Sequence, residues 1–274
     1  MSFGAAMRQP EGMWTVKSEI DIQGKAPLPP SAVAEIAGLA ARSAAARGVL
    51  MQVIGFAGSK AENALEALPD SVKEAIEATT ERALELAYRG AEATGKARRA
   101  PEMGRHGHAL AAVVSGAAGG FGGLASATVE IPVTVGIIFA AIQKAARAEG
   151  FDPADEAVRR ECLMVFAAGD PADPADDGVN TSFLMSRAMI SGASLHRLVA
   201  TVAPRLAAAL TQKLAAQTLP VLGSVAGAGI NYAFTRYYQE LAEIRFALLR
   251  LARDHGEDAV TQAFRRERAL PAGS

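Results

Sequence analysis

Residues 109–143 read ALAAVVSGAAGGFGGLASATVEIPVTVGIIFAAIQ, and Glu130 is the only charged residue among them. A helix of a soluble protein normally carries a polar face. A run this long that lacks one is therefore buried in protein on all sides or lies partly in lipid. A second run, residues 214–235, reads LAAQTLPVLGSVAGAGINYAFT and carries no charge. These two segments predict a helical protein that is organised around them.

Glycine residues divide both apolar segments. The first segment is interrupted by Gly116, Gly119, Gly120, Gly122 and Gly123, and its Val/Ile-rich half also contains Pro132. Such spacing favours a helical hairpin or two broken helices over one straight span.

Several of these glycines are four residues apart. The GxxxG spacing lets two helix backbones approach closely, because glycine has no side chain to hold them apart. The pairs are Gly116 with Gly120, Gly119 with Gly123, and Gly223 with Gly227. We therefore predict an all-α, multi-helix bundle in which two Gly/Ala-rich helical hairpin segments pack together.

Residues 128–138, TVEIPVTVGII, also suit a β-strand, because β-branched residues are frequent among them. Pro132 and the uninterrupted passage into FAAIQKAARAE favour a helix with a proline in its first turns instead.

The composition limits the class of protein. Of the 274 residues, 50% are hydrophobic and only 5% are aromatic, which predicts a core of Ala, Leu, Val and Ile. The net charge of −1 gives no support to a nucleic-acid partner. Cys162 is the only cysteine, so an intramolecular disulfide is excluded and a reducing compartment is expected. The first residues show no secretory signal, and we expect a cytoplasmic protein.

Turn-forming residues suggest how the chain is organised. Residues 1–30 are rich in proline and glycine and predict an extended or disordered arm. Residues 31–270 predict a single helical domain, with the acidic, proline-containing loop 170–178 as a candidate internal boundary. Capping residues and apolar periodicity predict its helices. They are expected at about 31–54, 71–94, 153–168, 181–201, 204–217, 222–253 and 257–268.

No catalytic or cofactor motif has its required context. Residues 120–125 match a loose GxGxxG/A pattern, but the alternating strands and helices of a dinucleotide-binding fold are absent. Cys162 lies on an expected amphipathic helix and is interpreted as a core residue. Ser115 and Ser126 lie among Gly and Ala and are interpreted as packing residues. We predict no catalytic residue and no cofactor.

Four histidines were considered as metal ligands: His106, His108, His196 and His255. They lie mostly in polar or basic surroundings without ligand spacing. The closest pair, His106 and His108, fits a weak metal contact or a solvated turn, and the second interpretation is preferred. We predict no metal site.

Two groups of polar residues remain as candidates. Basic residues precede the first apolar segment and suit anionic lipid headgroups, although a solvated turn is the alternative. They are Lys96, Arg98, Arg99 and Arg105. Glu130, inside an apolar run, must be paired, protonated or at an interface. A structural ion pair is expected, with Arg159, Arg160 or Arg187 as partner. The alternative is contact with a headgroup or cation, and buried Asn231 is a further neighbour to consider.

Several blocks together resemble the EcsC family of bacteria over roughly residues 75–252. The pattern comprises Glu130-x-Pro132-Val-Thr134, Ala148-Glu149-Gly150, Arg159-x-Glu161-Cys162-Leu-x-Val-Phe166, Pro220-x-x-Gly223 and Gly229-x-Asn231-Tyr232-x-Phe234-Thr235. The resemblance implies an all-helical, membrane-associated protein whose family is named for a protein encoded beside an ABC transporter. The family is sometimes labelled a peptidase, but no catalytic set can be carried over. Glu130, Arg159, Glu161 and Asn231 are the buried polar candidates.

Two hypotheses about function follow. The first is a protein at the inner face of the cell membrane that binds lipid through residues 109–143 and 214–235, as a peripheral or hairpin-inserted protein supporting transport or secretion. The second is a soluble, non-enzymatic protein that regulates an ABC transporter or a secretion component, with the apolar segments as its core. The sequence fixes neither the ligand nor the oligomeric state.

Overall fold

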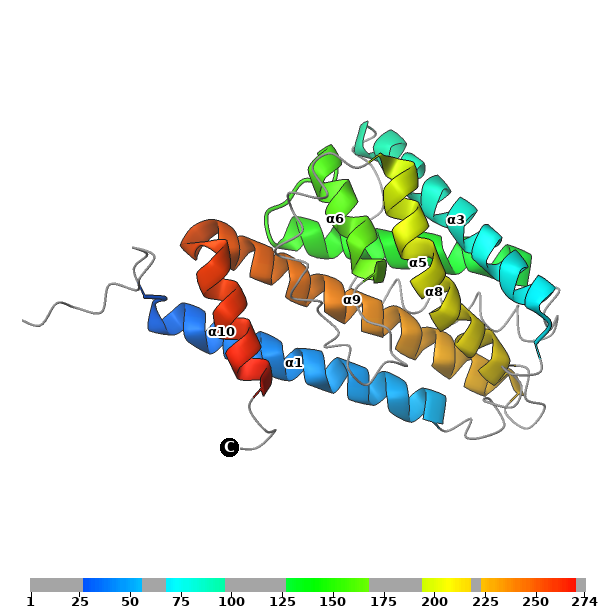
Figure 1. Ribbon diagram of the computed structural model, residues 1–274, viewed down its shortest axis with the longest axis horizontal. Helices are drawn as coiled ribbons and strands as arrows, with labels where there is room; N and C mark the ends of the chain where they lie inside the picture. Colours follow the sequence, from blue (N-terminus) through cyan, green and yellow to red (C-terminus); the bar gives the residue numbers. More distant parts are fainter. Residues whose placement is uncertain (1–26, 56–67, 97–126, 168–193, 218–222, 270–274) are drawn as a thin grey trace, which may run out of the picture.

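The computed structural model describes residues 27–55, 68–96, 127–167, 194–217 and 223–269 (Figure 1). These stretches form seven α-helices and contain no β-strand, so the all-α prediction is confirmed, including the helix over residues 128–138. The helices are α1 (Pro30–Gly55), α3 (Asp70–Lys96), α5 (Ala127–Ala148), α6 (Glu156–Ala167), α8 (Leu195–Gln217), α9 (Gly223–His255) and α10 (Glu257–Ala269). Residues 1–26 of the expected arm 1–30, most of the first glycine-rich segment and the loop 170–178 lie outside the described residues.

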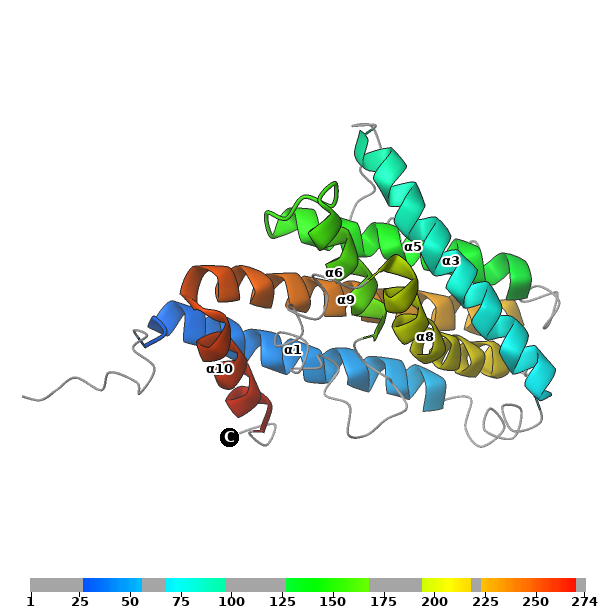
Figure 2. The same cartoon turned by 45° about the horizontal axis from the view of Figure 1, so that its top comes forward.

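Helix α9 is the centre of the bundle. It packs against α1 and α10 on one side and against α5, α6 and α8 on the other, as Figures 1 and 2 show. A helix that is covered all round must be apolar all round. From Leu241 to Ala252 the side chains of α9 are accordingly buried, with only Glu243 and Arg250 partly exposed. The core that they join is built mainly from Ala, Leu, Val, Ile and a few aromatic rings.

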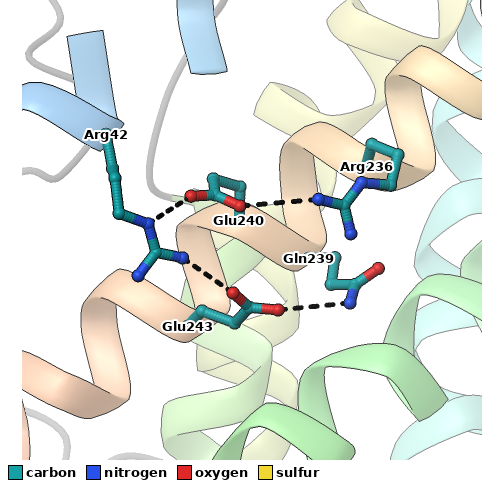
Figure 3. Close-up of polar contacts among 5 residues, drawn as sticks. All are labelled: Arg42, Arg236, Gln239, Glu240 and Glu243. Atoms are coloured by element: carbon teal, nitrogen blue, oxygen red, sulfur yellow. Dashed lines mark hydrogen bonds and ion pairs between the residues drawn. The ribbon is translucent and has the colours of Figure 1, made fainter. Parts of the chain in front are cut away.

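Helix α1 is attached to α9 by ion pairs as well as by apolar contacts. Arg42 of α1 donates from Nε to Glu240 at 2.6 Å and from Nη2 to Glu243 at 2.7 Å (Figure 3). Closer to the start of α1, Glu35 pairs with Arg250 of α9. Residue numbers rise along α1 as they fall along α9, so the two helices are antiparallel.

Helix α8 differs from the prediction at one boundary. A break was expected before Pro204, but α8 is one helix from Leu195 to Gln217 with Pro204 inside it. Pro204 is exposed, and so is Ala200, whose carbonyl the proline ring would crowd. A helix can curve there with its convex side toward solvent while its opposite, buried face keeps its packing. Residues 181–193, expected in the same helical region, lie outside the described part of the chain.

Helix α5 ends in a Schellman motif. Gly150 has φ of +80°, which an L side chain rarely adopts. Its N–H donates to the Arg147 carbonyl at 3.1 Å, and the Phe151 N–H donates to the Ala146 carbonyl at 2.9 Å. The chain then turns into α6, which begins at Glu156 rather than at the expected Pro153 because residues 153–155 form a turn.

Two glycines, one inside α5 and one in the turn after it, should respond oppositely to substitution. Gly136 lies inside the helix, and a Cβ added there would have no atom within 4 Å. We expect Gly136→Ala to raise the free energy of unfolding by about 1 kcal/mol, because alanine favours the helix. Gly150→Ala should lower it by about 1–2 kcal/mol because of its positive φ. Urea unfolding of both variants tests this, and a loss of stability in Gly136→Ala would contradict the open surroundings of Gly136.

Candidate functional site

Glu130 forms a buried ion pair that joins two helices. Its Oε1 accepts a hydrogen bond from Nζ of Lys213, on α8, at 2.6 Å. The side chains of Lys213 and Glu130 are only 2% and 4% exposed. The same ammonium lies 5.9 Å from the centroid of the Phe234 ring on α9. One cation therefore connects α5, α8 and α9.

Burial disfavours the charged form of Lys213, and Glu130 offsets part of this effect. Burial lowers the pKa of Lys213 from its ordinary value, whereas the charge and hydrogen bond of Glu130 act in the opposite direction. Removing either partner would leave the other charge buried without compensation, and such losses cost far more than a surface pair contributes.

Glu130 does form an ion pair, but its partner is Lys213, and the predicted partners Arg159 and Arg160 have other contacts. Arg159 donates instead to the backbone carbonyls of Pro153 and Ala154 and lies 5.4 Å from the centroid of the Tyr88 ring. Arg160 pairs with Glu156 at 2.6 Å on its own helix. Arg187 lies outside the described residues. Lys213 was not among the predicted partners, although it directly precedes the uncharged residues 214–235. A single cation at the edge of an apolar run is the feature of the sequence that could have indicated it.

Among the other candidates, Glu161 forms a second interior charge pair, with Arg245. Arg245 of α9 donates from Nη2 to Glu161 of α6 at 2.5 Å. Burial lowers the pKa of Arg245 to about 9, so the guanidinium still carries its charge at neutral pH. The neighbouring Cys162 is fully buried, and burial raises the pKa of its thiol to about 12. A buried thiol that stays protonated at neutral pH is a packing residue.

Helices α5 and α9 run in the same direction. Glu130, near the start of α5, meets the Lys213 ammonium beside Phe234, whereas Glu149, just after the end of α5, accepts a hydrogen bond from Arg250 at 2.7 Å. The start of α5 and the first half of α9, which are far apart in the sequence, therefore lie at the same end of the bundle. Around the ion pair, α5 contributes buried Thr134, and α9 contributes buried Asn231 and Thr235. This end of the α5–α9 core therefore contains several buried polar side chains.

A second feature lies on the opposite side of α5. Residues three and four apart share a helix face. One such stripe is exposed or partly exposed in the described chain, and it is apolar over its first turns and basic in its last turns. It consists of Val133, Gly136, Ile137, Ala140, Lys144 and Arg147, all exposed or partly exposed. From Val133 to Arg147 it extends about 21 Å. We call it the α5 stripe.

Helix α5 also contains the one segment of the described chain that is long and apolar enough to cross a membrane, Glu130–Ala148. More than half of that segment is buried inside the protein, and core helices of soluble proteins often have the same length and composition. One apolar face of α5 therefore packs in the core, and another apolar face forms the first turns of the α5 stripe.

Most of the remaining sequence candidates fall beyond what the structure describes. Arg98, Arg99 and Arg105, the histidines at 106 and 108, and the glycines of the first segment lie outside the described residues. Lys96 is the last residue of α3, and Gly223 and Gly227 lie in the first turns of α9. Arg236, on α9, lies 3.7 Å from Glu240 (Figure 3).

Comparison with known proteins gives one match. The model of the EcsC protein family matches residues 51–251, which include all of α3, α5, α6 and α8 and most of α9. No curated protein and no solved structure matches the chain significantly.

The buried ion pair can be tested with a double-mutant cycle. We expect Glu130→Leu or Lys213→Met alone to lower the free energy of unfolding by about 3–5 kcal/mol, because each leaves one buried charge without a partner. The double variant should recover most of this loss, since two apolar side chains then replace two charges. The measurement is urea unfolding of the parent and the three variants.

Arg42→Met serves as the control for this cycle. It removes the partly exposed cation that contacts Glu240 and Glu243 and should cost about 1 kcal/mol or less. Losses that simply add in the Glu130/Lys213 double variant would contradict the coupling of the two charges.

Proposed function

Because the chain belongs to the EcsC protein family, and the resemblance to this family implies membrane association, we propose that it acts at the cytoplasmic face of the cell membrane by binding lipid through α5. The observation that carries this proposal is the α5 stripe, an apolar surface on the most apolar helix described.

The α5 stripe changes character along its length. Val133, 42% exposed, begins an apolar surface that continues over Gly136, Ile137 and Ala140. Lys144 and Arg147 follow within two turns. Apolar insertion and attraction to anionic headgroups together hold a peripheral protein that neither interaction holds alone. A helix with this order can place its apolar turns against acyl chains and its basic end among the headgroups.

Helix α9 adds an aromatic residue at the same end. Tyr232 is 39% exposed and lies two residues before Phe234, at the end of the bundle where Glu130 and Lys213 meet. Tyrosine suits the boundary between acyl chains and headgroups because its ring is apolar and its hydroxyl is polar. Within this proposal, the basic residues Lys96 to Arg105 are further headgroup contacts.

Vesicle flotation of the purified protein tests the proposal. Val133→Asp/Ala140→Asp places two carboxylates on the α5 stripe without filling the core, so the fold should survive. We expect this variant to bind anionic vesicles at least tenfold more weakly than the parent, because each charge would have to enter the apolar boundary.

Leu86→Asp is the matched control, because Leu86 is a 65% exposed apolar residue on a different helix, α3. It should float like the parent. Equal flotation of the parent and the Val133→Asp/Ala140→Asp variant, or absence of the parent from the lipid fraction at low salt, would refute lipid binding through α5.

A second function is favoured by the small residues of the same surface. Gly136 and Ala140 are four residues apart, and this spacing lets a partner helix approach closely. The alternative is therefore a regulatory protein whose α5 stripe docks on a helix of an ABC transporter or a secretion component.

Gly136→Leu separates the two functions. A Cβ added at Gly136 would have no atom within 4 Å, and Gly136 is exposed, so we expect the fold to be kept. If α5 contacts lipid, vesicle binding should stay equal or become stronger, because the surface is more apolar. If α5 contacts a partner helix, the bulky residue should abolish membrane recruitment in cells while flotation on pure lipid stays absent. Weaker flotation of Gly136→Leu would contradict the first function.

A further inference from the structure

Three side chains of metal-binding type converge where α3 packs against α8. Glu81 and Glu85 come from α3, and His196 comes from the first turn of α8. Each offers one ligand atom, and the three atoms lie within 4.8 Å of one another. Figures 1 and 2 show the two helices side by side in both views.

The spacing on α3 suits a shared ligand. Glu81 and Glu85 are four residues apart, so their side chains project from the same helix face one turn apart. Two ligands at this spacing on one helix are a recurrent arrangement in metalloproteins. The third ligand is far away in the sequence and is brought near only by the packing of α8 on α3.

The charges at this place are poorly compensated. Like charges four residues apart on a helix repel each other. The Nδ1 atom of His196 lies 3.9 Å from Glu81, and Arg89 lies 3.4 Å from Glu85. Both pairs are largely exposed, and exposed pairs at such distances contribute little. A divalent cation among the three ligands would replace these weak contacts with direct bonds, and displacing Arg89 would cost little.

We infer that Glu81, Glu85 and His196 form a binding site for a divalent transition-metal ion. An imidazole nitrogen favours Zn²⁺ or a neighbouring transition metal over Mg²⁺ and Ca²⁺, which take oxygen ligands. Three protein ligands leave a fourth position of a tetrahedral Zn²⁺ for water. The bound ion ties α3 to α8 on the outside of the bundle, apart from the Glu130–Lys213 pair.

Isothermal titration of the untagged, full-length protein with Zn²⁺ alone tests the site. We expect one ion per chain and a rise in the thermal unfolding midpoint, because the ion binds only where the two helices are packed. His196→Ala and Glu81→Gln/Glu85→Gln should each weaken Zn²⁺ binding about tenfold or more. Mg²⁺ titrated under the same conditions should not displace Zn²⁺.

Two controls distinguish this site from other histidines. His255→Ala changes a histidine at the end of α9, and His106→Ala/His108→Ala removes the pair considered from the sequence; both variants should bind Zn²⁺ like the parent. Circular dichroism confirms that each variant is folded. Zn²⁺ binding that persists unchanged in His196→Ala, or that is lost in His106→Ala/His108→Ala alone, would overturn the assignment, as would no binding by the parent at about 100 µM Zn²⁺.

Discussion

Two opposite charges in an apolar interior must stay in contact, and the Glu130–Lys213 pair places this constraint on the bundle. The 2.6 Å contact fixes α5 against α8, and the Phe234 ring beside the ammonium brings α9 into the same arrangement. Sliding either helix by one turn would separate the charges in a medium that cannot solvate them. Apolar side chains supply most of the burial, and we expect this pair to favour one register over others that would bury a similar area.

The sequence predicted the helices well where local signals were strong. The ends of α9 and α10 were close to those observed, and Pro132 was correctly placed inside a helix because the apolar pattern continues beyond it. Pro204 was misjudged because its effect depends on exposure, which only the packing of α8 decides. The partner of Glu130 could not be found from spacing, since Lys213 is brought to it by tertiary structure. The same holds for His196 beside Glu81.

The first apolar segment was expected to be wholly buried or partly in lipid, and its described part has one face buried in the core and one exposed face. Ile131, Val135, Ile138 and Ile142 are buried in the core, whereas Val133, Gly136 and Ala140 are exposed. When a helix is apolar on every face, its sequence does not indicate which face the rest of the chain covers. Only the positions of α3, α6 and α9 around α5 reveal the stripe that they leave open.

The antiparallel attachment of α1 has an evolutionary consequence. Most of α1 and all of α10 lie outside residues 51–251, the range that matches the family. Arg42 of α1 nevertheless holds two carboxylates of α9, Glu240 and Glu243, which lie inside that range (Figure 3). The acidic pair on α9 and the arginine on α1 should therefore be inherited together. A relative without the N-terminal helix would be expected to carry neutral or apolar residues at both α9 positions, whose side chains would then face solvent or another subunit.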